Sequence, residues 1–236
     1  MQQFQHTLND QERLLLTVAE QLKVPFVQIA HLAEQSKLEP SSANWQTVRA
    51  TAAAALGLVE SYALSLRLHG NLDQPELVPM TVSSLLYDTA QELSQFAKQY
   101  NVELELDASA HLLPIMGDRA VLQSALTSLG YVFVEASTAV EKRSVVRLAA
   151  YRTRYGIVAG LYSSMPDFGA DSLRRAHQLH GRARQPLQQL AASPAAGVFV
   201  ADSLLQTLSA RLHVARYHKL TGLAATLVPS QQLQLV

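Results

Sequence analysis

The chain has no cysteine among its 236 residues, which excludes disulfide bonds, thiolate metal sites and cysteine nucleophiles. It has no excess charge of either sign, because 19 Lys and Arg residues balance 19 Asp and Glu residues. No overall field therefore attracts nucleic acid or an anionic membrane surface. The chain also lacks a run approaching about 18 uncharged apolar residues and a basic start followed by an apolar segment. We expect a soluble cytoplasmic protein with no membrane span and no nucleic-acid partner.

Patterns for familiar catalytic and metal sites are also missing. There is no phosphate-binding P-loop, and no Ser-His-Asp order can be proposed. The histidines form no recognised ligand set, and the pair His177 and His180, spaced i, i+3, is more often chance than a metal site. We expect no bound metal.

What the chain does contain is a 48% hydrophobic content, enough for packed cores. Between residues 9 and 37, apolar residues recur at spacings of 3, 4 and 7, which is typical of a helix with a partner. A breaker cluster at residues 39–42 follows, and Asn44 can cap a second helix. The seam of that helix consists of Trp45, Val48, Ala52, Ala55, Val59, Tyr62 and Leu66. Residues 9–72 therefore predict an antiparallel helical hairpin, and a second copy would bury the seams in a dimeric four-helix bundle.

After a linker that contains Pro75 and Pro79, the pattern changes to mixed helices and strands, which predicts a second domain over residues 80–236. The expected helices cover residues 82–99, 118–136, 172–179 and 198–211, and the expected strands cover residues 102–107, 144–151, 155–162, 212–217 and 223–228. Alternation in the strands at 144–151 and 155–162 is too weak to indicate which face is buried. The fold class is α+β.

Four stretches of sequence carry a resemblance to a known family. They are AEQLKVPF at 19–26, LSLRLHGNL at 64–72, GDRAVLQSALTSL at 117–129 and SARLHVARYHKLTGLAATLVP at 209–229. In their order and spacing they resemble the motifs of a two-component sensor histidine kinase core. The resemblance covers nearly the whole chain. It implies a dimerisation hairpin followed by an α/β sandwich of the histidine kinase ATPase type.

The resemblance also implies that the nucleotide site of that family is degenerate in this chain. Ser128 and Val132 stand where the family has asparagines that help to hold magnesium, and valine offers no lone pair. The adenine-binding aspartate and its glycines are replaced by a stretch that contains Ser163, Met165 and Asp167. A phosphate-side glycine remains at Gly197, but Phe199 replaces the next one. A slip of four residues in this alignment would instead bring Asp167 forward as the adenine acceptor. We expect no ATP binding and no cofactor.

The phosphorylated histidine of the family motif corresponds to Glu20. His31 lies 11 residues later, about 20° away around a helix, so it is an alternative phosphoacceptor on nearly the same face. An ordinary surface histidine is the simpler interpretation of His31. Receiver domains of response regulators dock beside the phosphoacceptor in this family, and the matching positions here are Glu20, Lys23, Val24, Val27, Gln28 and His31.

The sequence therefore predicts a homodimeric, catalytically inactive relative of histidine kinases that binds a response-regulator receiver domain or another signalling partner. The alternative is a histidine phosphotransferase of the same two-domain shape, which relays phosphate to a response regulator without ATP. The two hypotheses differ in whether a histidine occupies the acceptor position.

Overall fold

The computed structural model describes residues 26–27, 29, 33–34, 42–109, 112–137, 144–165, 170–174, 176 and 195–230. Its helices are α2 (Ser42–His69), α3 (Val82–Gln99), α4 (Arg119–Ser137) and α6 (Ala195–Thr207). Its strands are β1 (Val78–Met80), β2 (Val102–Ala108), β3 (Ile115–Gly117), β4 (Ser144–Thr153), β5 (Gly156–Ser163), β6 (Leu212–Tyr217) and β7 (Leu220–Leu227). Within these residues, no helix combines the length and apolar character that a membrane crossing requires. The mixture of helices and strands confirms the predicted α+β class.

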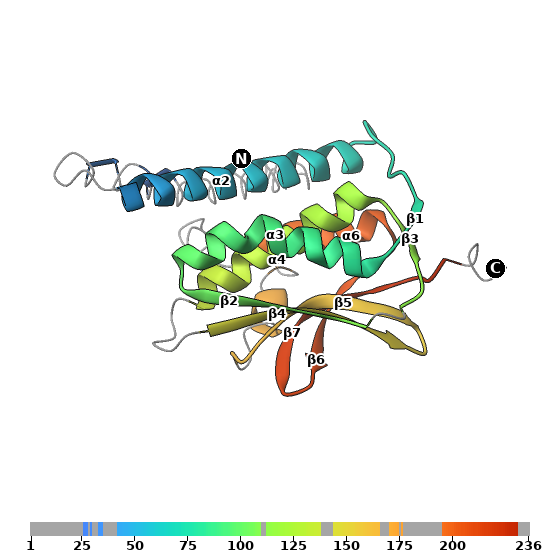
Figure 1. Ribbon diagram of the computed structural model, residues 1–236. Helices are drawn as coiled ribbons and strands as arrows, with labels where there is room; N and C mark the ends of the chain where they lie inside the picture. Colours follow the sequence, from blue (N-terminus) through green and yellow to red (C-terminus); the bar gives the residue numbers. More distant parts are fainter. Residues whose placement is uncertain are drawn as a thin grey trace, which may run out of the picture.

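The elements stack in three layers (Figure 1). The sheet forms the bottom layer, α3, α4 and α6 cover one of its faces, and α2 lies across these helices on the side away from the sheet. The main hydrophobic core fills the space between the sheet and the helices and continues into α2. The helical layer is thus apolar on both sides.

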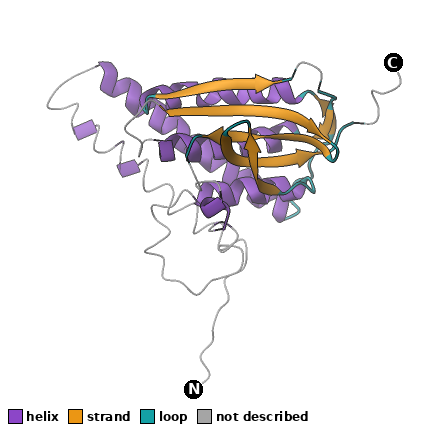
Figure 2. Ribbon diagram, turned by 90° about the horizontal axis from the view of Figure 1, so that it is seen from below, coloured by secondary structure: helices purple, strands orange, loops and turns teal. Residues whose placement is uncertain are grey.

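The main sheet has the strand order β2-β4-β5-β7-β6. Strands β2 and β4 are parallel, with Leu104 opposite Val146, and the other pairs are antiparallel. Figure 2, seen from below, shows these strands in front of the helices. Every residue of the central strand β5 is buried, because Leu161 points into the main core while Tyr162 belongs to a smaller cluster on the opposite face. Burial on both faces is the reason that the sequence showed no clear alternation in this strand.

Several boundaries differ from the predicted ones. The turn between the last two strands lies at His218–Lys219, where His218 has a positive φ of 52°. Strand β7 therefore begins at Leu220 and not at residue 223 as predicted. Helix α2 begins at Ser42, so Asn44 lies inside the helix and is not its cap. Strands β1 and β3 were not predicted. Strand β1, at the end of the predicted linker, pairs antiparallel with β3, and Pro79 lies opposite Met116. Three-residue strands are too short to produce a periodic signal.

The predicted hairpin is described only in part. Residues 26–27, 29 and 33–34 of the expected first helix are helical, and its remaining residues lie outside the described part of the chain. Helix α2 extends over the whole expected second helix, but its seam is divided between two surroundings. Tyr62 is 1% exposed in the main core, whereas Trp45 is 61% exposed and Val59 is 37% exposed.

Candidate functional site

The predicted nucleotide site falls at the junction of α4, the end of β5 and the start of α6. Ser128 and Val132 lie one turn apart on α4 and are both buried. Phe199 lies in the first turns of α6 and is 3% exposed, and Gly197 just before it is buried. Helices α4 and α6 pack directly against each other, and Val132 and Phe199 belong to the same core cluster. The positions that would face a nucleotide therefore carry core side chains.

Polar groups at this junction do not form a donor set for a magnesium nucleotide. The Ser128 hydroxyl is buried and has no hydrogen-bond partner within the described residues, and it could offer one oxygen. Ser163 is also buried, and its Oγ accepts a hydrogen bond of 3.4 Å from the backbone N–H of Met165. Across the described ranges, His, Asp and Glu side chains do not gather in groups of three or more that could hold a metal. Magnesium prefers six oxygen ligands, so the described residues of this site do not fit it. Asp167 lies outside those residues.

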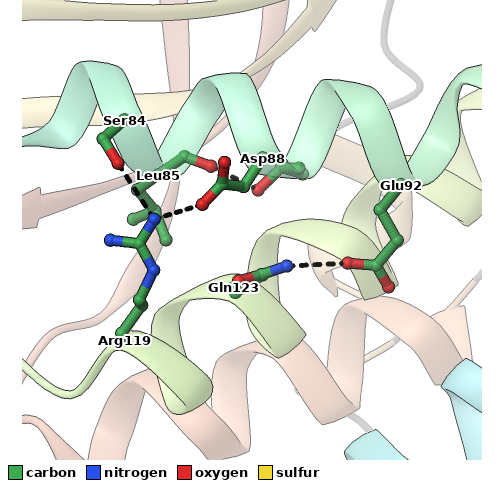
Figure 3. A network of polar contacts seen from close by, with 7 residues as sticks. Ser84, Leu85, Asp88, Glu92, Arg119 and Gln123 are labelled. Atoms are coloured by element: carbon green, nitrogen blue, oxygen red, sulfur yellow. Dashed lines mark hydrogen bonds and ion pairs between the residues drawn. The ribbon is translucent and has the colours of Figure 1, made fainter.

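A polar ladder joins the exposed sides of α3 and α4 next to this junction (Figure 3). Arg119 donates to Asp88 and to the Ser84 hydroxyl, the latter at 2.9 Å. One turn further along, Glu92 accepts hydrogen bonds from Gln123 at 3.0 Å and from Thr127 at 3.2 Å. Both helices contribute residues at intervals of four, so the contacts repeat along one face of each. The ladder adds polar contacts to the apolar packing between the two helices.

Comparison with solved structures connects this architecture to known proteins. The histidine kinase AdeS from Acinetobacter baumannii superposes with a TM-score of 0.54 at 9% identity, over 89% of this chain and 97% of AdeS. The fold is that of a histidine kinase core. A bacterial phosphotransferase has a TM-score of 0.53 at 9% identity, over 93% of this chain and 98% of its own. Full-length ShkA, solved in complex with AMPPNP, gives 0.51 at 15% identity, over 94% of this chain and 47% of ShkA.

These likenesses are structural only. No protein-family model matches the chain. No curated protein matches it by sequence. The resemblance in sequence motifs and the likeness in fold nevertheless point to the same family of architectures, which confirms the predicted histidine-kinase-like α/β sandwich.

Within this kinase fold, the predicted acceptor face is mostly outside the described residues. This applies to Glu20, Lys23, Val24, Gln28 and His31. Val27 is described, is helical and is exposed, as is its neighbour Phe26. Two adjacent exposed apolar side chains on a helix are compatible with the predicted docking patch.

The contact between α2 and helices α4 and α6 was not predicted from the sequence. A Cβ atom added to Gly57 of α2 would lie 3.2 Å from the hydroxyl oxygen of Tyr131 on α4. Burial, followed by the nearby charges of Glu92 and Glu60, raises the pKa of Tyr131. The available signal was the spacing of small residues in α2, where Gly57, Ser61 and Ser65 recur every four positions.

Proposed function

We propose that this chain is a signalling protein of histidine kinase fold that neither binds nor hydrolyses ATP and acts through protein–protein contacts. The observation that carries the proposal is the burial of Phe199 and Val132 in the core between α4 and α6. By resemblance, these positions correspond to a phosphate-side glycine and a metal-side asparagine. A nucleotide there would have to displace packed side chains, and it would find few groups to bind it.

The hydrogen bonds that a nucleotide would lose at this site also support the proposed absence of ATP binding. A hydrogen bond to a charged acceptor contributes about 1.5–3 kcal/mol, so losing the adenine aspartate alone weakens binding about tenfold or more. Ser163, at that position, is uncharged, and its hydroxyl already bonds to the backbone of Met165. Loss of the metal ligand and of the glycine adds to this cost.

Two surfaces support a binding role. By resemblance, Val27 is one of the positions at which a receiver domain docks, and both Val27 and its neighbour Phe26 are exposed. Large exposed apolar groups often mark interaction sites. On α2, Trp45, Leu56 and Val59 are exposed at heptad spacing, which suits a helical partner from a second copy of the chain. We therefore propose a homodimer that binds a response-regulator receiver domain or a similar signalling protein.

Calorimetric titration with millimolar Mg-ATP tests whether the predicted nucleotide site binds ATP, and we expect no saturable heat. Saturable heat would contradict the proposal.

For the docking surface, the Val27→Glu variant is compared with Lys219→Glu, a charge reversal on the exposed β6–β7 turn. Binding of receiver domains from the same genome should weaken in the first variant and stay unchanged in the second. Equal binding by both variants would move the docking site elsewhere.

The bacterial phosphotransferase, which matches nearly the full length of this chain, favours a second function. In that case the protein relays phosphate between receiver domains through a histidine, and His31 is the candidate acceptor. Incubation with a phosphorylated receiver domain distinguishes the two functions. Acid-labile phosphate that appears on the wild type and on His69→Ala, but not on His31→Ala, would establish the relay. No transfer to any of the three would leave the binding function.

A further inference from the structure

Helix α2 carries two separate apolar stripes. The inner stripe includes Ala54, Leu58 and Tyr62, all packed in or against the main core. The outer stripe includes Trp45, Leu56 and Val59, all exposed. At 100° per residue the centres of the two stripes are about 130° apart around the helix. A helix with two apolar stripes can pack against two partners. The inner stripe of α2 packs against α4 and α6 of the same chain.

The inner contact is made by side chains of the main hydrophobic core. Tyr62 is fully buried, and Leu68 at the end of the helix joins the same cluster. Earlier in the helix, Gly57 lets the Tyr131 ring approach the α2 backbone, because a side chain there would meet the tyrosine hydroxyl. The rings of Phe96 on α3 and Tyr131 pack in a T-shaped arrangement with ring centroids 4.9 Å apart. Side chains from α2, α3 and α4 therefore form one continuous cluster.

Polar contacts hold both ends of α2, because its start is bonded to α3 and its end is paired with the connector, residues 70–77. Near its start, Gln99 Nε2 of α3 donates hydrogen bonds to the carbonyl oxygens of Gln46 at 3.1 Å and Thr47 at 3.3 Å. Near its end, Arg67 of α2 pairs with Asp73 of the connector at 3.0 Å. These contacts are exposed or half-buried and individually weak, but they act at both ends of the helix.

Asp118 links the connector to α4. Its Oδ1 accepts a hydrogen bond of 3.1 Å from the N–H of Val121, which caps the start of α4. Its Oδ2 accepts one of 2.8 Å from the N–H of Glu76 in the connector. One carboxylate thus fastens the connector to the first turn of the helix.

From these contacts we propose that α2 and the kinase-like part form one cooperative folding unit, and that the connector at residues 70–77 does not act as a hinge. The kinase-like part, residues 80–236, then holds α2 in one orientation. In that orientation the outer stripe faces the second copy of the chain in the proposed dimer. This arrangement depends on the buried inner stripe and not on whether the protein binds ATP or carries phosphate.

Native-state hydrogen exchange on the full-length protein, in increasing urea at one protein concentration, tests the proposal. We expect amides in the middle of α2, at residues 54–65, to exchange with the same urea dependence as those of β5, because both open only in global unfolding. If α2 amides exchange through a separate opening while β5 stays protected, the helix undocks and the proposal is wrong.

A pair of variants on α2 supports the same test. Tyr62→Ala should accelerate exchange in α2 and in β5 by the same factor, more than about tenfold, because deleting a buried aromatic ring destabilises the whole unit. Arg49→Ala, an exposed position on the same helix, should change neither. Acceleration confined to α2 in Tyr62→Ala would overturn the proposal. If Tyr62→Ala does not fold, the wild-type urea series alone decides.

Discussion

At the scale of single residues, Gly57 shows two opposing effects at one position. In a helix interior, glycine is less favourable than alanine by about 1 kcal/mol, so Gly57→Ala gains helix propensity. The new Cβ atom would also lie 3.2 Å from the Tyr131 hydroxyl, a crowded contact. We predict that Gly57→Ala gives little or no gain in the free energy of unfolding of the wild type. In a Tyr131→Phe background the same change should stabilise by up to about 1 kcal/mol. Urea unfolding of the four proteins measures the coupling, and equal effects in both backgrounds would show that the two residues do not interfere.

Asp118 provides a second prediction at this scale. Asp118→Ala removes both acceptor oxygens and should lower the free energy of unfolding by about 1–2 kcal/mol, as for other helix caps. Asp118→Asn retains a side-chain oxygen for one of the two N–H donors, so it should retain part of that stability. The urea midpoints of the two variants give the comparison. An asparagine variant no more stable than the alanine variant would show that the caps contribute through charge alone.

The replaced residues of the nucleotide site could be predicted from the sequence, because the family motif specifies which residue type is expected at each position. Ser128, Val132 and Phe199 were expected at that site, and the structure places all three in buried positions of α4 and α6. The sequence did not indicate that these residues would be buried, since burial depends on how α4 and α6 pack. Asp167 and the predicted acceptor face, Val27 excepted, lie outside the described residues, so those assignments stay predictions.

At the scale of elements, α2 shows why a correct helix prediction can still misplace a face. The heptad seam was drawn through both Val59 and Tyr62, which lie about 60° apart around the helix. The structure assigns Tyr62 to the core of its own chain and leaves Val59 on the outer stripe. Periodicity reveals that a helix has apolar faces, but it does not name the partner of each.

The division of α2 into two stripes leads to a prediction about assembly. Val59 is 37% exposed, so Val59→Glu leaves the folded chain intact but places a charge in the proposed dimer interface. We expect light scattering at tens of micromolar to give a dimer for the wild type and a monomer for Val59→Glu. Circular dichroism should show the same helix content in both. Lys219→Glu, an exposed position on the β6–β7 turn and not on α2, is the control and should remain dimeric. A dimeric Val59→Glu protein would place the interface elsewhere.

At the scale of the whole molecule, the proposed loss of ATP binding is distributed over α4, β5 and α6, so it should not be reversed at one position. Phe199→Gly restores the glycine that the resemblance implies, but it also deletes a core side chain. We expect the free energy of unfolding to fall by about 3–5 kcal/mol, as for other buried aromatic truncations. Calorimetry with Mg-ATP should still give no saturable heat, because the variant leaves Val132 in place of the metal-side asparagine. Val228→Gly, a 71% exposed position after β7, controls for the added glycine and should cost far less stability. Saturable ATP binding by Phe199→Gly would mean that a single ring closes an otherwise competent site.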